Sequence, residues 1–121
     1  MKLAIVGSRS WSNAALLKRT LDQYAEVHGV EHHITVISGG AAGADSMGEA
    51  WARKNGYPVE VIRPDWERYG RSAGFKRNED IIREADIVFA FWDGSSKGTL
   101  DSINKARRLG IEVRVITEVL N

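Results

Sequence analysis

Short runs of apolar residues alternate with longer stretches of helical periodicity along this chain. The apolar runs cover residues 3–6, 34–37, 59–62, 86–92 and 111–116. Because polar residues rarely interrupt them, we expect strands that are buried on both faces, as in a parallel sheet. Between the runs, apolar residues recur at three- and four-residue steps, as at Leu17, Leu21 and Tyr24, and this spacing predicts helices.

The repeated alternation of strand and helix predicts an α/β fold. We expect a Rossmann-like three-layer sandwich, with a five-stranded parallel sheet in the order 3-2-1-4-5 and the whole chain, 1–121, in a single domain. Ser12 or Asn13 is expected to cap the first helix, and Gly56 and Gly110 are expected to follow the ends of later helices. In this strand order, ligands bind where the order reverses, at the carboxyl ends of the strands.

Glycine-rich or hydroxyl-rich turns follow the first, second and fourth expected strands. The candidate residues are Gly7 and Ser8 after the first strand, Ser38, Gly39, Gly40 and Gly43 after the second, and Asp93, Gly94, Gly98 and Thr99 after the fourth. Such turns let backbone N–H groups approach an anion, and the helix that follows adds unpaired donors. The glycines fit an ordinary strand-to-helix turn equally well, and they match neither the dinucleotide-binding fingerprint nor a P-loop.

Two charged residues accompany these turns. Arg9 follows the first strand, where its guanidinium can bind a phosphate or form a surface salt bridge. Asp45 falls in the first turn of the second helix, where it can compensate the helix dipole or accept hydrogen bonds from ligand hydroxyls. We favour a ligand role for Asp45 because it directly follows a glycine-rich turn.

The segment 65–78 lacks a clear amphipathic period, and we interpret it as a long loop that covers the crevice. Its aromatic residues can stack on a base or pack the loop down, and its cations can contact phosphates. The candidate ligand residues here are Trp66, Tyr69, Arg71, Lys76, Arg77 and Asn78. Arg77 is expected near the start of the helix that contains Ile81 and Ile82.

The composition limits the function classes. Seventeen Lys and Arg residues against sixteen Asp and Glu residues leave a formal charge of +1, which does not favour a binder of duplex DNA. The chain has no cysteine, and the adjacent His32 and His33 would point to opposite faces of a strand, so we expect no metal and no cofactor. The first apolar run is too short for a signal peptide or a membrane span, so we expect a soluble, cytoplasmic protein without membrane contact.

Several of these motifs together resemble a known superfamily. They are Gly7-Ser8-Arg9-x-Trp11, Ser38-Gly39-Gly40-Ala41-x-Gly43-Ala44-Asp45, Asp65-Trp66-x-x-Tyr69-Gly70-x-x-Ala73-Gly74-x-x-Arg77-Asn78, and Gly98-Thr99 before a helix. In this order they resemble the SLOG superfamily, which joins the DNA-processing protein DprA and the LONELY GUY enzymes. The chain is most similar to its YspA-related branch of small bacterial and phage proteins. The resemblance implies a Rossmann-like domain that binds nucleotides or nucleotide-derived molecules, often as a homo-oligomer.

Enzymes of this superfamily cleave the N-glycosidic bond of nucleoside monophosphates, with a Pro-Gly-Gly-x-Gly-Thr-x-x-Glu motif and an arginine from the segment before the fourth strand. Gly98-Thr99 matches the motif and Arg77 matches the arginine, but Ser102 stands where the motif has its catalytic glutamate. Serine carries no charge to stabilise an oxocarbenium-like centre. Asp45, Asp93 and Asp101 are the carboxylates that can take its place.

Three functions therefore compete. The first is a sensor or sequestering module that binds a nucleoside phosphate, an ADP-ribose-like molecule or a nucleotide sugar. The alternative is a phosphoribohydrolase-like N-glycosidase, in which Arg77 stabilises developing charge and Asp45 or Asp101 supplies the carboxylate. The third is a protein that binds single-stranded nucleic acid through cations such as Arg71 and Lys76; the near-neutral net charge disfavours it.

Overall fold

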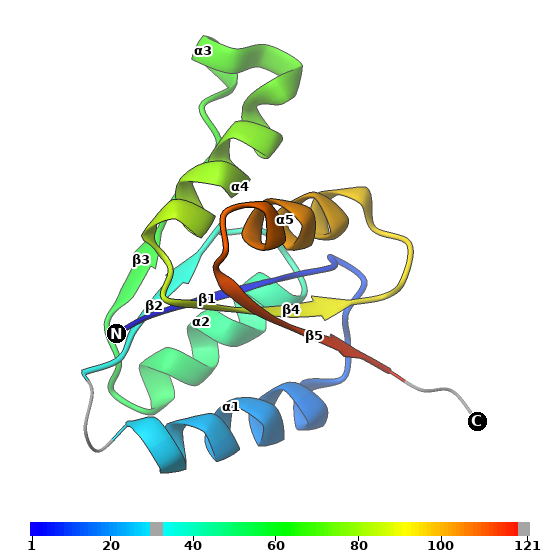
Figure 1. The fold of residues 1–121 in the computed structure, drawn as a ribbon. Helices are drawn as coiled ribbons and strands as arrows, with labels where there is room; N and C mark the ends of the chain where they lie inside the picture. Colours follow the sequence, from blue (N-terminus) through cyan, green and yellow to red (C-terminus); the bar gives the residue numbers. More distant parts are fainter. Residues whose placement is uncertain (30–32, 119–121) are drawn as a thin grey trace.

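A computed structural model describes residues 1–29 and 33–118 and confirms the predicted α/β fold (Figure 1). A five-stranded parallel sheet has the order β3-β2-β1-β4-β5, as expected. The strands are β1 (Lys2–Gly7), β2 (Thr35–Ser38), β3 (Val59–Val61), β4 (Ile87–Trp92) and β5 (Glu112–Thr117). The helices are α1 (Ala14–His28), α2 (Ala44–Lys54), α3 (Trp66–Tyr69), the 3-10 helix η1 (Gly70–Ser72), α4 (Ala73–Glu84) and α5 (Lys97–Arg108).

Helices cover both faces of the sheet. In Figure 1, α1 and α2 lie below the sheet, and α4 and α5 lie above it. Successive residues of β1 alternate between the two layers: Leu3 and Ile5 pack with residues of α1 and α2, whereas Ala4 and Val6 pack with residues of α4 and α5. These four side chains are 0–5% exposed. Burial on both faces explains why the strand sequences are continuously apolar.

The predicted helix ends are confirmed. The side chain of Asn13 accepts a hydrogen bond from the backbone N–H of Leu16 at 3.0 Å and so caps α1. Gly56 and Gly110 follow the ends of α2 and α5 with φ angles of +77° and +72°, a conformation that glycine adopts at little cost.

The prediction of a long loop over residues 65–78 is wrong, because the chain is helical from Trp66 onwards. Asp65 caps α3 by accepting a hydrogen bond from the N–H of Arg68 at 3.1 Å. No residue of α3 or η1 is buried, so these turns carry no apolar stripe that would show in the sequence. Arg77 lies in the second turn of α4, which begins at Ala73. We call α3 and η1, residues 66–72, the arm; it projects away from the sheet in Figure 1.

Gly43 allows the start of α2 to pack directly on the backbone that follows β1. Its φ angle is +76°, and a Cβ atom at this position would lie 2.4 Å from the carbonyl oxygen of Ser8 and 2.5 Å from that of Arg9. The next residue, Ala44, donates its backbone N–H to the same oxygen of Ser8 at 3.3 Å. This contact places the segment after β1 beside the start of α2.

We predict that Gly43→Ala destabilises the protein far more than Gly56→Ala. Both glycines have positive φ, but a Cβ atom at Gly56 would meet nothing within 4 Å. The conformational cost alone should lower the free energy of unfolding by about 1 kcal/mol for Gly56→Ala, and the added clash should raise the loss to about 3 kcal/mol for Gly43→Ala. Urea unfolding of both variants measures the difference, and equal losses would contradict this account of the packing.

Candidate functional site

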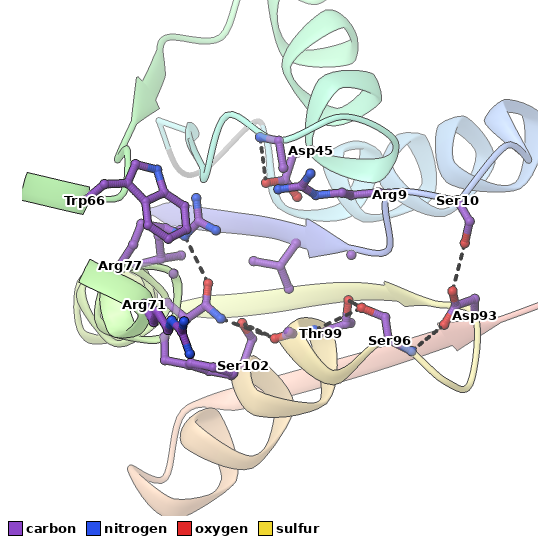
Figure 2. Close-up of a pocket in the computed structure, with 18 residues that line it drawn as sticks. Arg9, Ser10, Asp45, Trp66, Arg71, Arg77, Asp93, Ser96, Thr99 and Ser102 are labelled. Atoms are coloured by element: carbon purple, nitrogen blue, oxygen red, sulfur yellow. Dashed lines mark hydrogen bonds between the residues drawn. The ribbon is translucent and has the colours of Figure 1, made fainter. Parts of the chain in front are cut away.

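A cavity of about 470 Å³ lies at the carboxyl ends of β1 and β4, between α5 and the start of α4. Figure 2 shows Trp66, Arg71 and Arg77 at one end of it and Ser10 and Asp93 at the other. The sequence-predicted residues that line it are Gly7, Arg9, Asp45, Trp66, Arg71, Arg77, Asn78, Asp93, Gly98 and Thr99. The fold thus brings together candidates from the segments after β1, β2, β3 and β4.

Other predicted residues do not line this cavity. They are Ser8, Ser38, Gly39, Gly40, Gly43, Tyr69, Lys76, Gly94 and Asp101. Several have partners within the protein: the Ser38 hydroxyl donates to Glu49 at 2.8 Å, and the Lys76 ammonium pairs with Glu79 at 3.2 Å. Tyr69 lies under the guanidinium of Arg68, which is 5.2 Å from the ring centroid.

The turn after β2 faces a guanidinium instead of open space. Arg77 Nη1 donates a hydrogen bond to the carbonyl oxygen of Gly39 at 2.6 Å. A Cβ atom on Gly39 would lie 2.8 Å from that nitrogen and 2.9 Å from Oδ2 of Asp45. A glycine is therefore needed here for the close approach of Arg77 and Asp45, and the turn reaches the cavity through Ala41 and Asp45.

Asp45 is a buried carboxyl group at the wall of the cavity. It is 5% exposed, and its Oδ2 accepts a hydrogen bond from the backbone N–H of Ala41 at 3.3 Å. Burial raises the pKa of Asp45 from 3.8 to about 6, although the nearby charge of Arg77 partly opposes the shift. The charge of this residue therefore changes close to neutral pH.

Three guanidinium groups from three separate segments of the chain line the cavity. Arg9 follows β1, Arg71 belongs to η1, and Arg77 belongs to α4; Arg9 and Arg71 are exposed. Burial lowers the pKa of Arg77, but arginine keeps its charge at neutral pH even so. A locally positive cavity results in a chain whose formal net charge is +1.

Asp93 holds the turn that leads into α5. Its carboxylate accepts hydrogen bonds from the hydroxyl of Ser10 at 2.8 Å and from the backbone N–H groups of Ser95 at 2.9 Å and Ser96 at 2.8 Å. These donors keep the pKa of Asp93 well below its usual range. Asp93 is thus a permanently ionised acceptor that orients the start of α5, and the first N–H groups of that helix lack intrahelical partners.

Ser102 lines the cavity from the first half of α5. Its hydroxyl donates to the carbonyl oxygen of Gly98 at 3.4 Å. The neighbouring Asp101 is not a lining residue; its Oδ2 accepts from the Lys105 ammonium at 2.8 Å. Among the described residues, the carboxylates that line the cavity are therefore Asp45 and Asp93.

Comparison with known proteins identifies the family. Residues 1–69 match the family described as "YspA, cpYpsA-related SLOG family". The chain is also 36% identical over 118 residues to the Gene 61 protein of Mycobacterium phage D29, an alignment that covers 93% of each chain. The chain belongs to the YspA-related SLOG family. This confirms the resemblance found in the sequence motifs.

Solved structures confirm the fold of this SLOG protein. DNA processing protein A (DprA) from Streptococcus pneumoniae superimposes with a TM-score of 0.77 at 20% identity, covering 98% of this chain and 51% of that chain. DNA processing protein A from Helicobacter pylori, whose structure is described for its single-stranded DNA binding mode, superimposes with a TM-score of 0.75 at 19% identity. The match covers 100% of this chain and 67% of that chain. The SLOG protein thus spans about half the length of the S. pneumoniae chain.

Ser10, Ser96 and Ser102 also line the cavity, although the sequence does not predict them as ligand residues. Ser96 could have been found, since a serine three residues before Thr99 at a helix start is a capping pattern; its hydroxyl accepts from the N–H of Thr99 at 3.4 Å. No local pattern indicates Ser10, because its partner Asp93 is 83 residues away.

The described residues of the SLOG protein include no group of three or more His, Asp or Glu side chains placed to hold a metal ion. Of the adjacent histidines considered in the sequence, His32 lies outside the described residues. Across ranges 1–29 and 33–118, no helix has the length and apolar composition needed to cross a membrane.

We predict that Asp45 makes stability fall as pH rises. The folded state raises the pKa of Asp45 to about 6, so this group favours the folded state when it is protonated. Its contribution to the free energy of unfolding is fully present below the unfolded pKa of 3.8 and is lost as pH rises through 6. The free energy of unfolding should therefore drop by about 3 kcal/mol from this group between about pH 4 and about pH 7. Urea unfolding across this range should show the drop in the wild type and its loss in Asp45→Asn.

Asp80→Asn is the control for this experiment. It removes a carboxylate that is 48% exposed on the surface of α4 and should retain the pH dependence of the wild type. A pH profile of Asp45→Asn that parallels the wild-type profile would show that Asp45 is not the group responsible.

Proposed function

We propose that this SLOG protein binds a nucleotide or nucleotide-derived ligand in the cavity and does not cleave it. The observation that carries the proposal is the convergence of Arg9, Arg71 and Arg77 with the start of α5 around one cavity of about 470 Å³. This volume falls within the range of small-molecule sites, which is about 300–1,000 Å³.

The positive groups support binding of a phosphate. Arginine presents a planar fork of N–H donors that matches two phosphate oxygens, and it keeps its charge when partly buried. Gly98 and Thr99, in the first turn of α5, line the same cavity. The positive end of the α5 dipole favours an anion at this place.

Two aromatic side chains at the cavity support binding of a planar group. Trp66 on the arm is 58% exposed and Phe75 on α4 is 47% exposed, and both line the cavity. Large exposed aromatics are costly to leave in water and offer free ring faces on which a base can stack. A ligand with both a phosphate and a base satisfies both sets of side chains.

The acidic groups favour binding over cleavage. Ser102 supplies a hydroxyl where the related enzymes have a glutamate. The carboxylate of Asp93 already accepts hydrogen bonds from Ser10, Ser95 and Ser96, and Asp45 is buried with a raised pKa. Both carboxylates are engaged within the protein, Asp93 by its own turn and Asp45 by the backbone N–H of Ala41 and the nearby charge of Arg77. Neither is therefore free to stabilise an oxocarbenium-like centre.

Calorimetry and thermal melting with AMP, ADP-ribose and a nucleotide sugar test the proposal. At least one of the three should bind and raise Tm, because a ligand that binds the folded state stabilises it.

Arg71→Met should weaken binding by about tenfold, since a charged hydrogen bond contributes about 1.5 kcal/mol or more. The matched control is Arg68→Met: Arg68 is also an exposed arginine of the arm, but it does not line the cavity, and its loss should leave the affinity nearly unchanged. Absence of any Tm shift at millimolar concentrations would refute the proposal.

Chromatography of the same nucleotides after prolonged incubation tests the absence of cleavage. We expect AMP and CMP to remain intact, because Ser102 carries no charge and the two carboxylates that line the cavity, Asp45 and Asp93, are engaged within the protein. Release of free base would instead identify an N-glycosidase. Loss of that activity in Asp45→Asn, but not in Asp101→Asn, would then assign the carboxylate to Asp45.

A second candidate function is binding of single-stranded nucleic acid. The observation that favours it is the exposed ring of Trp66 on a projecting arm that also carries Arg68 and Arg71. Stacked aromatics combined with cations are the usual means of binding unpaired strands. If the protein has this function, an oligo-dT strand should bind it at low salt, and the affinity should fall steeply as salt rises. Trp66→Ala should bind the strand about tenfold more weakly. Equal binding by the wild type and Trp66→Ala would exclude the arm as the binding surface.

A further inference from the structure

A continuous chain of hydrogen bonds connects α5 with α4 and the turn after β2. The Lys105 ammonium donates to Oδ2 of Asp101 at 2.8 Å, and Nδ2 of Asn78 donates to the same oxygen at 3.2 Å. Oδ1 of Asn78 accepts from Nε of Arg77 at 3.0 Å. Arg77 ends the chain with its bond to the carbonyl oxygen of Gly39 at 2.6 Å. The position of the Arg77 guanidinium is thus defined at both of its edges.

The residues that form this chain of hydrogen bonds are sheltered from solvent, unlike an ordinary ion pair on a helix surface. The side chains of Lys105 and Asp101 are 16% and 21% exposed, and Asn78 is 8% exposed. The Lys18–Asp22 pair on α1 has the same spacing, but its side chains are 61% and 37% exposed. Exposed pairs contribute little, whereas sheltered polar groups in a connected network hold one another in place.

Asp101 and the carbonyl oxygen of Gly98 together set which way the Asn78 amide faces. The amide NH₂ donates to Oδ2 of Asp101 and to the carbonyl oxygen of Gly98 at 3.2 Å, while the amide oxygen accepts from Arg77. A reversed amide would place its NH₂ against the Arg77 donor and its oxygen against two acceptors. Asp101 and the carbonyl oxygen of Gly98 therefore keep the amide oxygen directed at Arg77.

Lys105 also fixes the turn of α4 that carries Phe75. Its ammonium donates to the carbonyl oxygen of Phe75 at 2.6 Å and lies 5.7 Å from the centroid of the Phe75 ring. Phe75 lines the cavity, whereas Lys105 does not. One sheltered cation thus holds two cavity residues, Phe75 directly and Arg77 through Asp101 and Asn78.

We infer that Lys105, Asp101 and Asn78 are positioning residues that hold Arg77 and Phe75 in the arrangement that binds the ligand. This inference rests on the proposed function, since it gives Arg77 a ligand contact. It assigns to Asp101 a role different from the catalytic one considered in the sequence: its carboxylate acts on the ligand through Asn78 and Arg77.

The Nε–H signal of Arg77 in a ¹H–¹⁵N NMR spectrum tests the inference without any ligand. The signal is assigned by its loss in Arg77→Lys. Lys105→Met keeps most of the side-chain stem but removes the ammonium, and should make this proton exchange with water about tenfold faster, because its acceptor is no longer held in place. Lys105→Arg, which restores a cation, should return the rate to near the wild-type value.

Arg107→Met is the matched control. It removes one positive charge from the same helix at an exposed position and should leave the Arg77 signal unchanged. The inference is overturned if Lys105→Met and Arg107→Met give the same Arg77 exchange rate. Should Lys105→Met fail to fold by thermal melting, Asp101→Asn, which preserves shape, replaces it against the same control and should also accelerate the exchange.

Calorimetry with AMP separates this inference from the proposed function. If AMP binds the wild type, Lys105→Met should bind it about tenfold more weakly and Arg107→Met should bind it nearly as tightly as the wild type, in line with the loss of one well-placed charged hydrogen bond. If the wild type binds none of the tested nucleotides, the proposed function fails. The NMR comparison still decides whether Lys105, Asp101 and Asn78 position Arg77. Faster exchange combined with unchanged AMP affinity would overturn the link from positioning to binding.

Discussion

The hydrogen bond between Arg77 and the carbonyl oxygen of Gly39 is the contact on which the arrangement of the cavity depends. It joins α4 to the turn after β2 across 38 residues of sequence. Since Gly39 has no side chain, the guanidinium can approach both the backbone and the buried carboxyl group of Asp45. The arm contributes no buried residues of its own, so its position over the cavity follows from the way α4 is held.

The charge distribution of the protein is local. The formal net charge of +1 would indicate a surface without a preference for anions. The fold nevertheless gathers Arg9, Arg71 and Arg77 around one cavity, while Asp93 is hydrogen-bonded to its own turn and Asp101 is paired with Lys105. Because nearby charges in a partly sheltered cavity interact more strongly than distant surface charges, this local arrangement and not the net charge sets the electrostatic potential in the cavity.

The relatives of this protein share its fold across very different degrees of sequence identity. The phage D29 relative aligns over 93% of both chains at 36% identity, whereas the DprA structures have the same fold at about 20% identity and in longer chains. One fold can support different activities, so function has to be argued from the site. Here the site has Ser102 and no free carboxylate in the wall that α5 contributes to the cavity.

The sequence by itself determined where the strands, the helix caps and the turns that lead to the cavity fall, because hydrophobic period and turn residues act over a few neighbouring positions. The strand order was predicted from the alternation of strands and helices, for which parallel sheets adopt few topologies. The sequence did not reveal that the arm is helical, since α3 has no buried face to produce a period. It also could not show that Arg77 faces Gly39 or that Ser10 bonds to Asp93, 83 residues away. Those contacts exist only once the sheet has brought distant segments to the same edge, and only the tertiary structure decides which polar groups meet there.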